Sequence, residues 1–422
     1  MADDFTTSEL RPLLERDFDT YITVADNAYP DARLGTPEER EKYRAVLAER
    51  LAKSPTSHVG IYRGETLLGG ARLHDFVMNA RGTQIAAAGI GMVAVDLAHK
   101  KEHVARDLMR AWLDYCRAHD VPFALLYPFR PDFYKQMGFG YGTKMSQYRV
   151  RPVGLPQRGD RKKVALLGAA EQEMVSDCYA RMQTRAHGLI RKSDDALDRV
   201  FSDHTKRVVG YREGSDVRGY AVFSFTEAAA NQFLTYDLVV DEMVYESREA
   251  LLGLLAFLRS QADQIERIVF NTQDDNFHLL LGDVRDGSQV LIPSVYHRSN
   301  AQGVGIMYRV TDVPRAFELL HSARFGEQSI TLRITVADSF LPENAGSLTV
   351  RFGDGHPTIA QDATADVEIT LDIAEFSSLL MGAADFRSLY RYGLAEISDA
   401  ALIEPVTRLF ATDEKPLCMT HF

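Results

Sequence analysis

The stretch from Gly91 to Gly142 holds the side chains best suited to chemistry. The apolar run Met92–Val95 predicts a buried strand, and the basic turn His99–Lys101 follows it directly. From His103 onward, apolar side chains recur with helical spacing, which predicts a helix start. Free amides and a positive dipole at a helix start attract anions, and the turn lysines and Arg106 would add charge. A pyrophosphate site is one interpretation, and a solvated basic loop is the other.

The same residues resemble a cofactor motif. Lys100-Lys101-Glu102-His103-Val104-Ala105 is similar, in its basic character and closing alanine, to the acetyl-CoA motif Gln/Arg-x-x-Gly-x-Gly/Ala of the GCN5-related N-acetyltransferases (GNAT). More closely, His99–Arg106 and Tyr134–Gly140 (YKQMGFG) resemble the enhanced intracellular survival (Eis) family of acetyltransferases. The resemblance implies acetyl-CoA as a co-substrate, bound by Val93, Ala94, Val95, Lys100, Lys101, His103, Val104, Ala105 and Arg106.

His103 departs from the family pattern, which usually has glycine at this position. Glycine lets the backbone approach a phosphate closely. His103 therefore either narrows the phosphate cradle or replaces the backbone contact with its imidazole. The sequence leaves both alternatives open, so acetyl-CoA affinity is the property in question.

Acetyl transfer to an amine needs a proton donor for the thiolate and a base for the amine. Tyr134 follows the predicted strand Phe123–Tyr127, and an unperturbed phenol, with a pKa of about 10, is protonated at neutral pH. A packing role is the alternative for Tyr134. The resemblance implies that Tyr134 is the general acid and that the carboxylate of the last residue, Phe422, is the general base. A carboxylate with a pKa of about 3.5 is a weak base, and His421 is the nearest rival.

The thioester carbonyl is expected to be polarised by backbone amides of the strand Val93–Val95, as in GNAT enzymes generally. The acceptor pocket is expected to lie near the first helices and the bend after the strand at 123–127. Its candidate residues are Tyr29, Asp31 and Tyr127. An acidic pocket would suit a cationic primary amine, such as an aminoglycoside, a lysine side chain or a polyamine. An exposed aspartate in a loop is the alternative reading of Asp31.

The elements that must position these residues follow the GNAT order in residues 1–151. A helix is predicted over Ser8–Ala25, and a second begins at Thr36, where Pro37 and Glu39 complete a capping box. Alternating apolar residues then predict strands at 57–62, 66–77 and 83–95. The strand, helix and strand of the cofactor motif complete this predicted acetyl-CoA-binding catalytic domain.

Two further domains are predicted. Residues 152–288 repeat the first plan weakly, but the turn before their helix at 247–262 has acids and no glycine, which are poor neighbours for phosphate. We interpret this segment as a degenerate GNAT-like domain, with an unrelated α+β domain as the alternative. Residues 289–422 resemble the sterol-carrier-protein-like domain that ends Eis-type chains. The C-terminus of this domain is expected to reach the active site.

Composition bounds the class of protein. The 422 residues carry a net charge of −11, which disfavours nucleic acid and favours cationic partners. The three cysteines have no CxxC spacing, which argues against a structural zinc, and no metal is expected. The acidic, polar N-terminus and the lack of a long apolar run predict a cytoplasmic protein without membrane contact. The resemblance implies a homo-oligomer, often a hexamer.

Together these features predict an α+β chain with tandem GNAT-like domains, whose mixed sheets are flanked by helices, and a sterol-carrier-protein-like α/β domain. The predicted function is direct acetyl transfer from acetyl-CoA to a primary amine. The alternative is a non-catalytic acyl-CoA-binding or apolar-ligand-binding protein in which the donor site is closed. An apolar-ligand carrier would need a sizeable cavity within residues 289–422.

Overall fold

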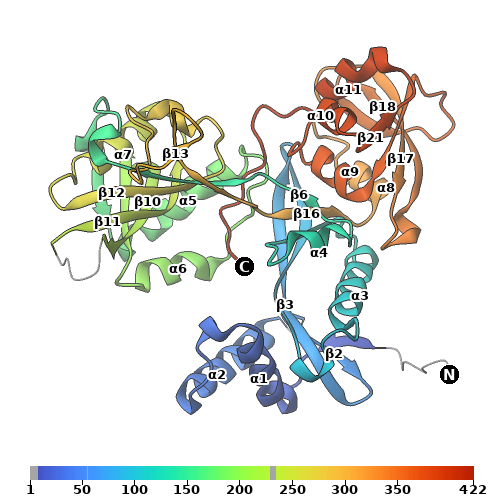
Figure 1. Ribbon diagram of the computed structural model, residues 1–422, viewed down its shortest axis with the longest axis horizontal. Coiled ribbons are helices and arrows are strands. Elements are labelled where there is room, and N and C mark those ends of the chain that lie inside the picture. The colour runs from blue at the N-terminus through green and yellow to red at the C-terminus, as the bar shows by residue number, and fades with distance from the viewer. Residues whose placement is uncertain (1–7, 55, 229–233) are drawn as a thin grey trace.

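The computed structural model describes residues 8–54, 56–228 and 234–422. Figure 1 shows three groups of elements, which follow one another in chain order. The C-terminus lies between the first and the second group, near the long strand β3 of the first. The first sheet has the strand order β1-β2-β3-β4-β5-β16-β6. Its elements are β1 (Glu9–Pro12), α1 (Phe18–Ala28), α2 (Pro37–Lys53), β2 (His58–Arg63), β3 (Thr66–Ala80), β4 (Thr83–Val95), α3 (Val104–Ala118), β5 (Phe123–Leu126), α4 (Pro131–Lys135), β6 (Gly140–Tyr141) and the inserted β16 (Met307–Val310).

The predicted helix over Ser8–Ala25 is wrong in its first half. Residues Glu9–Pro12 form β1, which pairs antiparallel with β2, and α1 begins at Phe18. Proline lacks a backbone donor and fixes φ, so Pro12 would break a helix interior but fits the end of an edge strand. The capping box at Thr36 is confirmed, because Thr36 and Glu39 exchange side-chain and backbone hydrogen bonds.

The second sheet has the order β15-β7-β12-β11-β10-β9-β8. Its strands and helices, with a neighbouring hairpin, are β7 (Met145–Val150), β8 (Val164–Leu167), α5 (Gln172–Gln183), α6 (Asp194–Ser202), β9 (Arg207–Glu213), β10 (Asp216–Glu227), β11 (Tyr236–Tyr245), α7 (Arg248–Arg259), β12 (Ile265–Thr272), β13 (Leu291–Ile292), β14 (Tyr296–His297) and β15 (Ala301–Gly303). This arrangement of helices and strands repeats that of the first group.

The third sheet has the order β19-β18-β17-β20-β21. Its strands and the neighbouring helices are α8 (Val313–Leu319), β17 (Ile330–Ala337), β18 (Gly346–Gly353), β19 (His356–Ile359), β20 (Val367–Asp372), α9 (Ile373–Leu380), α10 (Phe386–Arg391), β21 (Ala395–Ile397) and α11 (Ile403–Phe410). Among the described residues, no helix is both long and apolar enough to cross a bilayer.

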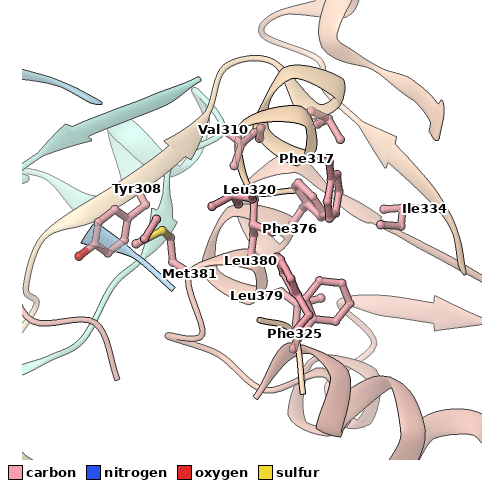
Figure 2. Close-up of a cluster of buried hydrophobic side chains, with 14 of the residues drawn as sticks. Tyr308, Val310, Phe317, Leu320, Phe325, Ile334, Phe376, Leu379, Leu380 and Met381 are labelled. Atoms are coloured by element: carbon pink, nitrogen blue, oxygen red, sulfur yellow. The ribbon is translucent and has the colours of Figure 1, made fainter. Parts of the chain in front are cut away.

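Strand β16 joins the first sheet to the third group. It lies between β5 and β6, and Met307 pairs with both Leu126 and Tyr141. Figure 2 shows Tyr308 of β16 beside Met381 and Val310 near Leu320, and these residues belong to one cluster with Phe317 of α8 and Phe376 of α9. The first sheet and the third group therefore share one hydrophobic core, and this core fixes how the C-terminal part of the chain sits against the first domain.

A fully buried ion pair strengthens the same junction. Arg309 of β16 donates to both carboxylate oxygens of Asp338, at 2.9 and 2.7 Å, and neither side chain is exposed. Arg309 also donates to the carbonyl of Met137. Asp338 accepts the backbone amide of Leu341 at 2.8 Å, so the pair holds the loop after β17 against the end of α4. The loop residue Phe340 is thereby placed beside α3.

Candidate active site

Helix α3 begins in the conformation that a phosphate cradle requires. His103 is its N-cap residue, with φ 62° and ψ 9° in the left-handed region, and it makes no side-chain capping bond. Lys101 also has a positive φ of 70°. These angles favour glycine, yet the backbone adopts them here with histidine and lysine. The loop therefore keeps its turn conformation although residue 103 is histidine and not glycine. The first amides of α3 have no side-chain cap.

A cavity of about 690 Å³ lies at this helix start. Basic and aromatic side chains line it, and no aspartate or glutamate is among its described lining residues. The cavity is lined by Val95, His99, Lys100, Lys101, His103, Val104, Ala105, Arg106, Phe129, Arg130, Phe133, Gln136, Met137 and Phe340. Glu102, the acidic residue of the turn before α3, does not line the cavity and pairs with Arg63 at 3.0 Å and with His99 at 3.3 Å. The cavity is therefore suited to a polyanion with an apolar extension, which is the chemistry of an acyl-CoA.

Phe340 brings the third group of elements into this cavity. Its backbone carbonyl accepts a 2.6 Å hydrogen bond from Arg110 on α3. Its ring lies below the guanidinium of Arg106, 5.7 Å from the ring centre, a cation–π distance. Sequence reasoning missed this residue, since nothing local in the sequence indicates that the loop after β17 returns to α3.

Strands β4 and β5 separate next to the cavity. They pair in parallel over Ala87–Gly89, and β4 then continues to Val95 without a pairing to β5 among the described residues. On its other side β4 stays paired with β3, including Gly70 opposite Ala94. The carbonyl of Val93 accepts a 3.0 Å hydrogen bond from the phenol of Tyr29. The predicted polarising strand thus has one free edge, and Tyr29 fixes its end.

Tyr134 lies on α4 in an aromatic cluster. Its ring centre is 5.8 Å from that of Phe129, 5.2 Å from Phe133 and 6.0 Å from Phe139. The residue is 3% exposed. Burial, with a smaller effect from Tyr29, raises the pKa of Tyr134 above its ordinary value. The phenol is therefore protonated at neutral pH, as a proton donor must be.

The C-terminal tail lies inside the protein and is held at successive residues. Thr143 donates to the carbonyl of Pro416 at 2.7 Å. The amide of Leu417 donates to the backbone carbonyl of His187 at 2.8 Å. Further along, the amide of Cys418 donates to the side chain of Gln273 at 2.6 Å, and the phenol of Tyr127 donates to the carbonyl of Thr420 at 3.1 Å. Elements of the first and second groups thus fix the path of the tail to its last residue.

Phe422 ends this path on the face of β3 and β4. Its ring centre lies 5.0 Å from Phe76, 5.2 Å from Tyr127 and 5.3 Å from His74. A methyl group added to Gly91 would lie 3.0 Å from the Phe422 carboxyl carbon. The end of the chain therefore lies against β4, one residue before the bulge at Met92, whose φ is 48°.

The three remaining candidate residues from the sequence are Asp31, Tyr127 and His421. Asp31 is exposed on the 3-10 turn Pro30–Ala32, and no described contact joins it to Tyr134 or Phe422. Tyr127 holds the tail through its hydroxyl instead of presenting it to an acceptor. His421 is exposed and stacks on Tyr127 at 6.1 Å.

Sequence reasoning missed two residues on this face of β3, His74 and Arg72, and His74 lies beside Phe422. Nε2 of His74 is buried without a hydrogen-bond partner and lies 3.9 Å from the added methyl position at Gly91. Burial, followed by Arg72 and His58, lowers the pKa of His74 to about 3, so the imidazole is neutral at pH 7. Arg72 lies two residues earlier and is opposite Gly91 in the antiparallel register. The alternation Arg72-Leu73-His74-Asp75-Phe76 was the available signal, since it places alternate residues on one face.

Comparisons with known proteins agree with this fold. A family described as an acetyltransferase (GNAT) domain matches residues 9–142, and a second acetyltransferase (GNAT) domain family matches residues 183–310. A sterol carrier protein domain family matches residues 313–419. These three matches follow the three groups of elements.

Relatives and solved structures match nearly the whole chain. An uncharacterized N-acetyltransferase of Streptomyces coelicolor is 25% identical, over 94% of this chain and 96% of its own length. The GCN5-related N-acetyltransferase from Anabaena variabilis superimposes with a TM-score of 0.80 at 16% identity, covering 98% of this chain and 100% of that one. Eis1 from Mycobacterium abscessus has a TM-score of 0.76 at 22% identity, covering 98% and 100%. The chain is therefore a GNAT N-acetyltransferase, with tandem acetyltransferase domains and a C-terminal sterol-carrier-protein-like domain in the Eis-like arrangement.

Proposed function

We propose that this enzyme transfers the acetyl group of acetyl-CoA directly to a primary amine, with Tyr134 as general acid and the Phe422 carboxylate as general base. One observation carries the proposal. The end of the chain lies against Gly91 of the same strand that leads, through Val95, to the acid-free cavity at α3. Donor cavity and terminal carboxyl group therefore lie along one strand, and the reaction needs them on opposite sides of the acetyl group.

The donor fits the residues that are present. The amides at the start of α3 and the turn residues Lys100 and Lys101 would hold the pyrophosphate, and Arg106, supported by Phe340, would add a third charge. The coenzyme supplies an activated thioester. The free edge of β4 at Val93–Val95 offers backbone amides for the thioester carbonyl, in a direction that β5 has left open.

The transfer forms a bond between the acceptor nitrogen and the carbonyl carbon and breaks the carbon–sulfur bond. The amine arrives mainly as an ammonium ion, and its proton passes to the base before or during attack. Tyr134 gives its phenolic proton to the leaving thiolate, and the second proton that the acylated nitrogen loses restores the phenol. Its raised pKa keeps that proton available at neutral pH.

The base side has two groups. A terminal carboxylate has a pKa of about 3.5 in water, so by itself it removes an ammonium proton poorly. The neutral imidazole of His74 lies beside it, with a buried and unpartnered Nε2. We propose that the Phe422 carboxylate accepts the proton, because exclusion of water raises the pKa of a carboxylate and lowers that of an amine. His74 stays neutral and serves only as a hydrogen-bonding neighbour of the amine. Aminoglycosides, lysine side chains and polyamines remain the amine classes proposed from the sequence.

The non-catalytic alternative predicts a closed donor site. His103 does not fill the site, because the cavity beside it measures about 690 Å³. An apolar-ligand carrier would need space inside the third group of elements, where Figure 2 shows aromatic and aliphatic side chains packed against one another. These observations favour the enzyme over both binding-protein alternatives.

The test is an assay of free CoA release with acetyl-CoA and a panel of primary amines. Tyr134→Phe is expected to reduce kcat about 100-fold or more, because general acid catalysis contributes roughly 10²–10⁴-fold. Extending the chain by one glycine after Phe422 should have a comparable effect, since it moves the carboxylate by about one residue length. Wild-type rates in either variant would remove that residue from the mechanism, and no release with any amine would refute the proposed function.

We also propose, from the family resemblance, a cytoplasmic homo-oligomer, with a hexamer as the expected assembly. The hairpin β13–β14 exposes apolar side chains, including Leu291 and Ile292 at about half of their full exposure, which suits a subunit contact. Light scattering on the purified protein measures the assembly directly.

A further inference from the structure

Positive charge surrounds the acceptor side of the site. Arg72 is opposite Gly91 on β4 and opposite His58 on β2 in antiparallel registers. Directly opposed residues of an antiparallel pair point to the same face of a sheet. The Gly91 position faces the Phe422 carboxyl group on that face. The guanidinium of Arg72 therefore leaves the sheet on the side where the acceptor amine must enter.

Arg72 has cationic neighbours instead of an acidic partner. Its pKa is lowered to about 10, first by burial and then by the charges of Arg50 on α2 and Arg199 on α6. Among the described residues, no ion pair within 4.0 Å joins Arg72 or Arg50 to a carboxylate, and this includes the chain terminus. Arg199 has an ion pair with Asp195 at 3.7 Å. Arg72 thus remains protonated at neutral pH and is half-buried without a counter-ion.

Two neutral imidazoles complete this group of residues. His58 is fully buried and its Nε2, like that of His74, has no hydrogen-bond partner. Both histidines have pKa values lowered to about 3, mainly by burial, so each carries a neutral ring with one N–H donor. Half-buried cations that repel one another lower stability unless an anion joins them. The Phe422 carboxylate lies on this face but forms no ion pair with Arg72 within 4.0 Å, so Arg72 can take a second anion.

We propose that Arg72 forms an anion subsite of the acceptor site, so that the acceptor is a primary amine carrying a carboxylate or a similar acidic group at its other end. The proposal rests on the proposed acetyltransferase function and narrows its substrate class. The net charge of −11 favoured a cationic acceptor, but that charge belongs to the whole surface. The local charge beside Phe422 has the opposite sign, and the local charge selects the ligand.

The subsite also separates the two ends of the acceptor. Its carboxylate would accept charge-assisted hydrogen bonds from Arg72, and its amine would lie near the terminal carboxyl group and His74. A diamine of the same length would instead place a second positive charge beside Arg72. The acceptor preference is therefore expected to be zwitterion first, neutral monoamine second and dication last.

The test uses ω-aminoalkanoates of four, five and six carbons, each matched with the n-alkylamine and the α,ω-diaminoalkane of equal length. With acetyl-CoA, kcat/KM for the preferred aminoalkanoate should exceed that of its matched alkylamine about tenfold to a hundredfold, as hydrogen bonds to charged groups allow. Arg72→Gln should remove most of this ratio through KM. The control Arg285→Gln, at a surface ion pair with Asp283 in the second domain, should keep the ratio.

A binding measurement gives an independent readout. Hexanoate is expected to raise the melting temperature of the wild type, and to raise that of Arg72→Gln much less. Alkylamines or diamines that serve as well as the aminoalkanoates would overturn the anion subsite while leaving the acetyltransferase intact. If Arg72 instead holds the Phe422 carboxylate, Arg72→Gln would lower kcat on every acceptor and leave the ratio unchanged, which also overturns the subsite. No CoA release with any amine would refute the proposed function itself.

Discussion

Adding one methyl group at Gly91 should slow acetyl transfer without weakening the donor. In Gly91→Ala the new carbon would stand 3.0 Å from the Phe422 carboxyl carbon and 3.2 Å from its oxygen, where ordinary contacts begin at 3.4 Å. The tail must therefore move by a few tenths of an ångström, about 0.2 to 0.4 Å. Because a misplacement of about 1 Å can cost about 100-fold in rate, we expect kcat to fall about tenfold, or about 1.4 kcal/mol in activation free energy.

The assay is steady-state CoA release at saturating acetyl-CoA and amine. The acetyl-CoA KM should stay unchanged, because the donor cavity is lined by the start of α3 and not by Gly91. Gly303→Ala is the matched control, since no atom lies within 4 Å of the methyl group it would add. Gly89→Ala should be more damaging, because its methyl would overlap the Phe76 ring and stand 2.8 Å from the Phe422 ring.

A double-variant cycle decides whether Gly91 acts through the tail. In a chain that lacks Phe422, the Gly91→Ala change should have no further effect, since the group that it displaces is gone. A wild-type kcat in Gly91→Ala, or an equal loss in the presence and absence of Phe422, would refute the proposed position of the general base.

Three further outcomes are expected. His103→Gly should not raise the Kd for acetyl-CoA. The melting temperature should be equal or higher, because a left-handed non-glycine residue costs about 1 kcal/mol. A much higher Kd in calorimetry would show that the imidazole contacts the coenzyme. Arg309→Met should lower the free energy of unfolding in urea by about 3–5 kcal/mol, because it leaves the buried Asp338 unpaired; a loss below about 1 kcal/mol would contradict this. Burial lowers the pKa of His58 to about 3 in the folded state, so the unfolded chain binds more protons between pH 3 and 6.5. Stability should fall as the pH drops through that window, and His58→Phe should flatten the slope by up to about 1.4 kcal/mol per pH unit; an unchanged slope in urea unfolding from pH 4 to 7 would contradict the assignment.

Local sequence signals predicted much of the architecture. The capping box at Thr36 and the change from strand to helical spacing around His103 depend on residues within a few positions, and both are present in the structure. The prediction of a helix over Ser8–Ala25 was wrong in its first half for a local reason as well, since Pro12 outweighs the apolar pattern around it. Tandem GNAT-like sheets followed from the order of such elements.

Long-range pairing explains what could not be predicted. Strand β16 enters the first sheet from residues 307–310, and β7 at 145–150 belongs to the second sheet, so sheet membership crosses the predicted boundaries after 151 and 288. A single sequence gives no signal for such exchanges. The same holds for Arg72 and Phe340, whose roles depend on what α2 and α3 bring beside them.

The position of the terminal carboxyl group follows from contacts spread over the whole chain. Gln273, directly after β12, and His187, after α5, hold the tail at Cys418 and Leu417, and Tyr127 of the first domain holds Thr420. Each hydrogen bond contributes about 1 kcal/mol, which by itself cannot order a flexible terminus. Several bonds in sequence leave the last residue little freedom, and the Phe422 ring then settles between Phe76 and Tyr127. In the proposed mechanism, donor binding needs the first domain and Phe340, whereas turnover needs all three domains folded together. A change that loosens the tail should therefore lower kcat before it weakens acetyl-CoA binding.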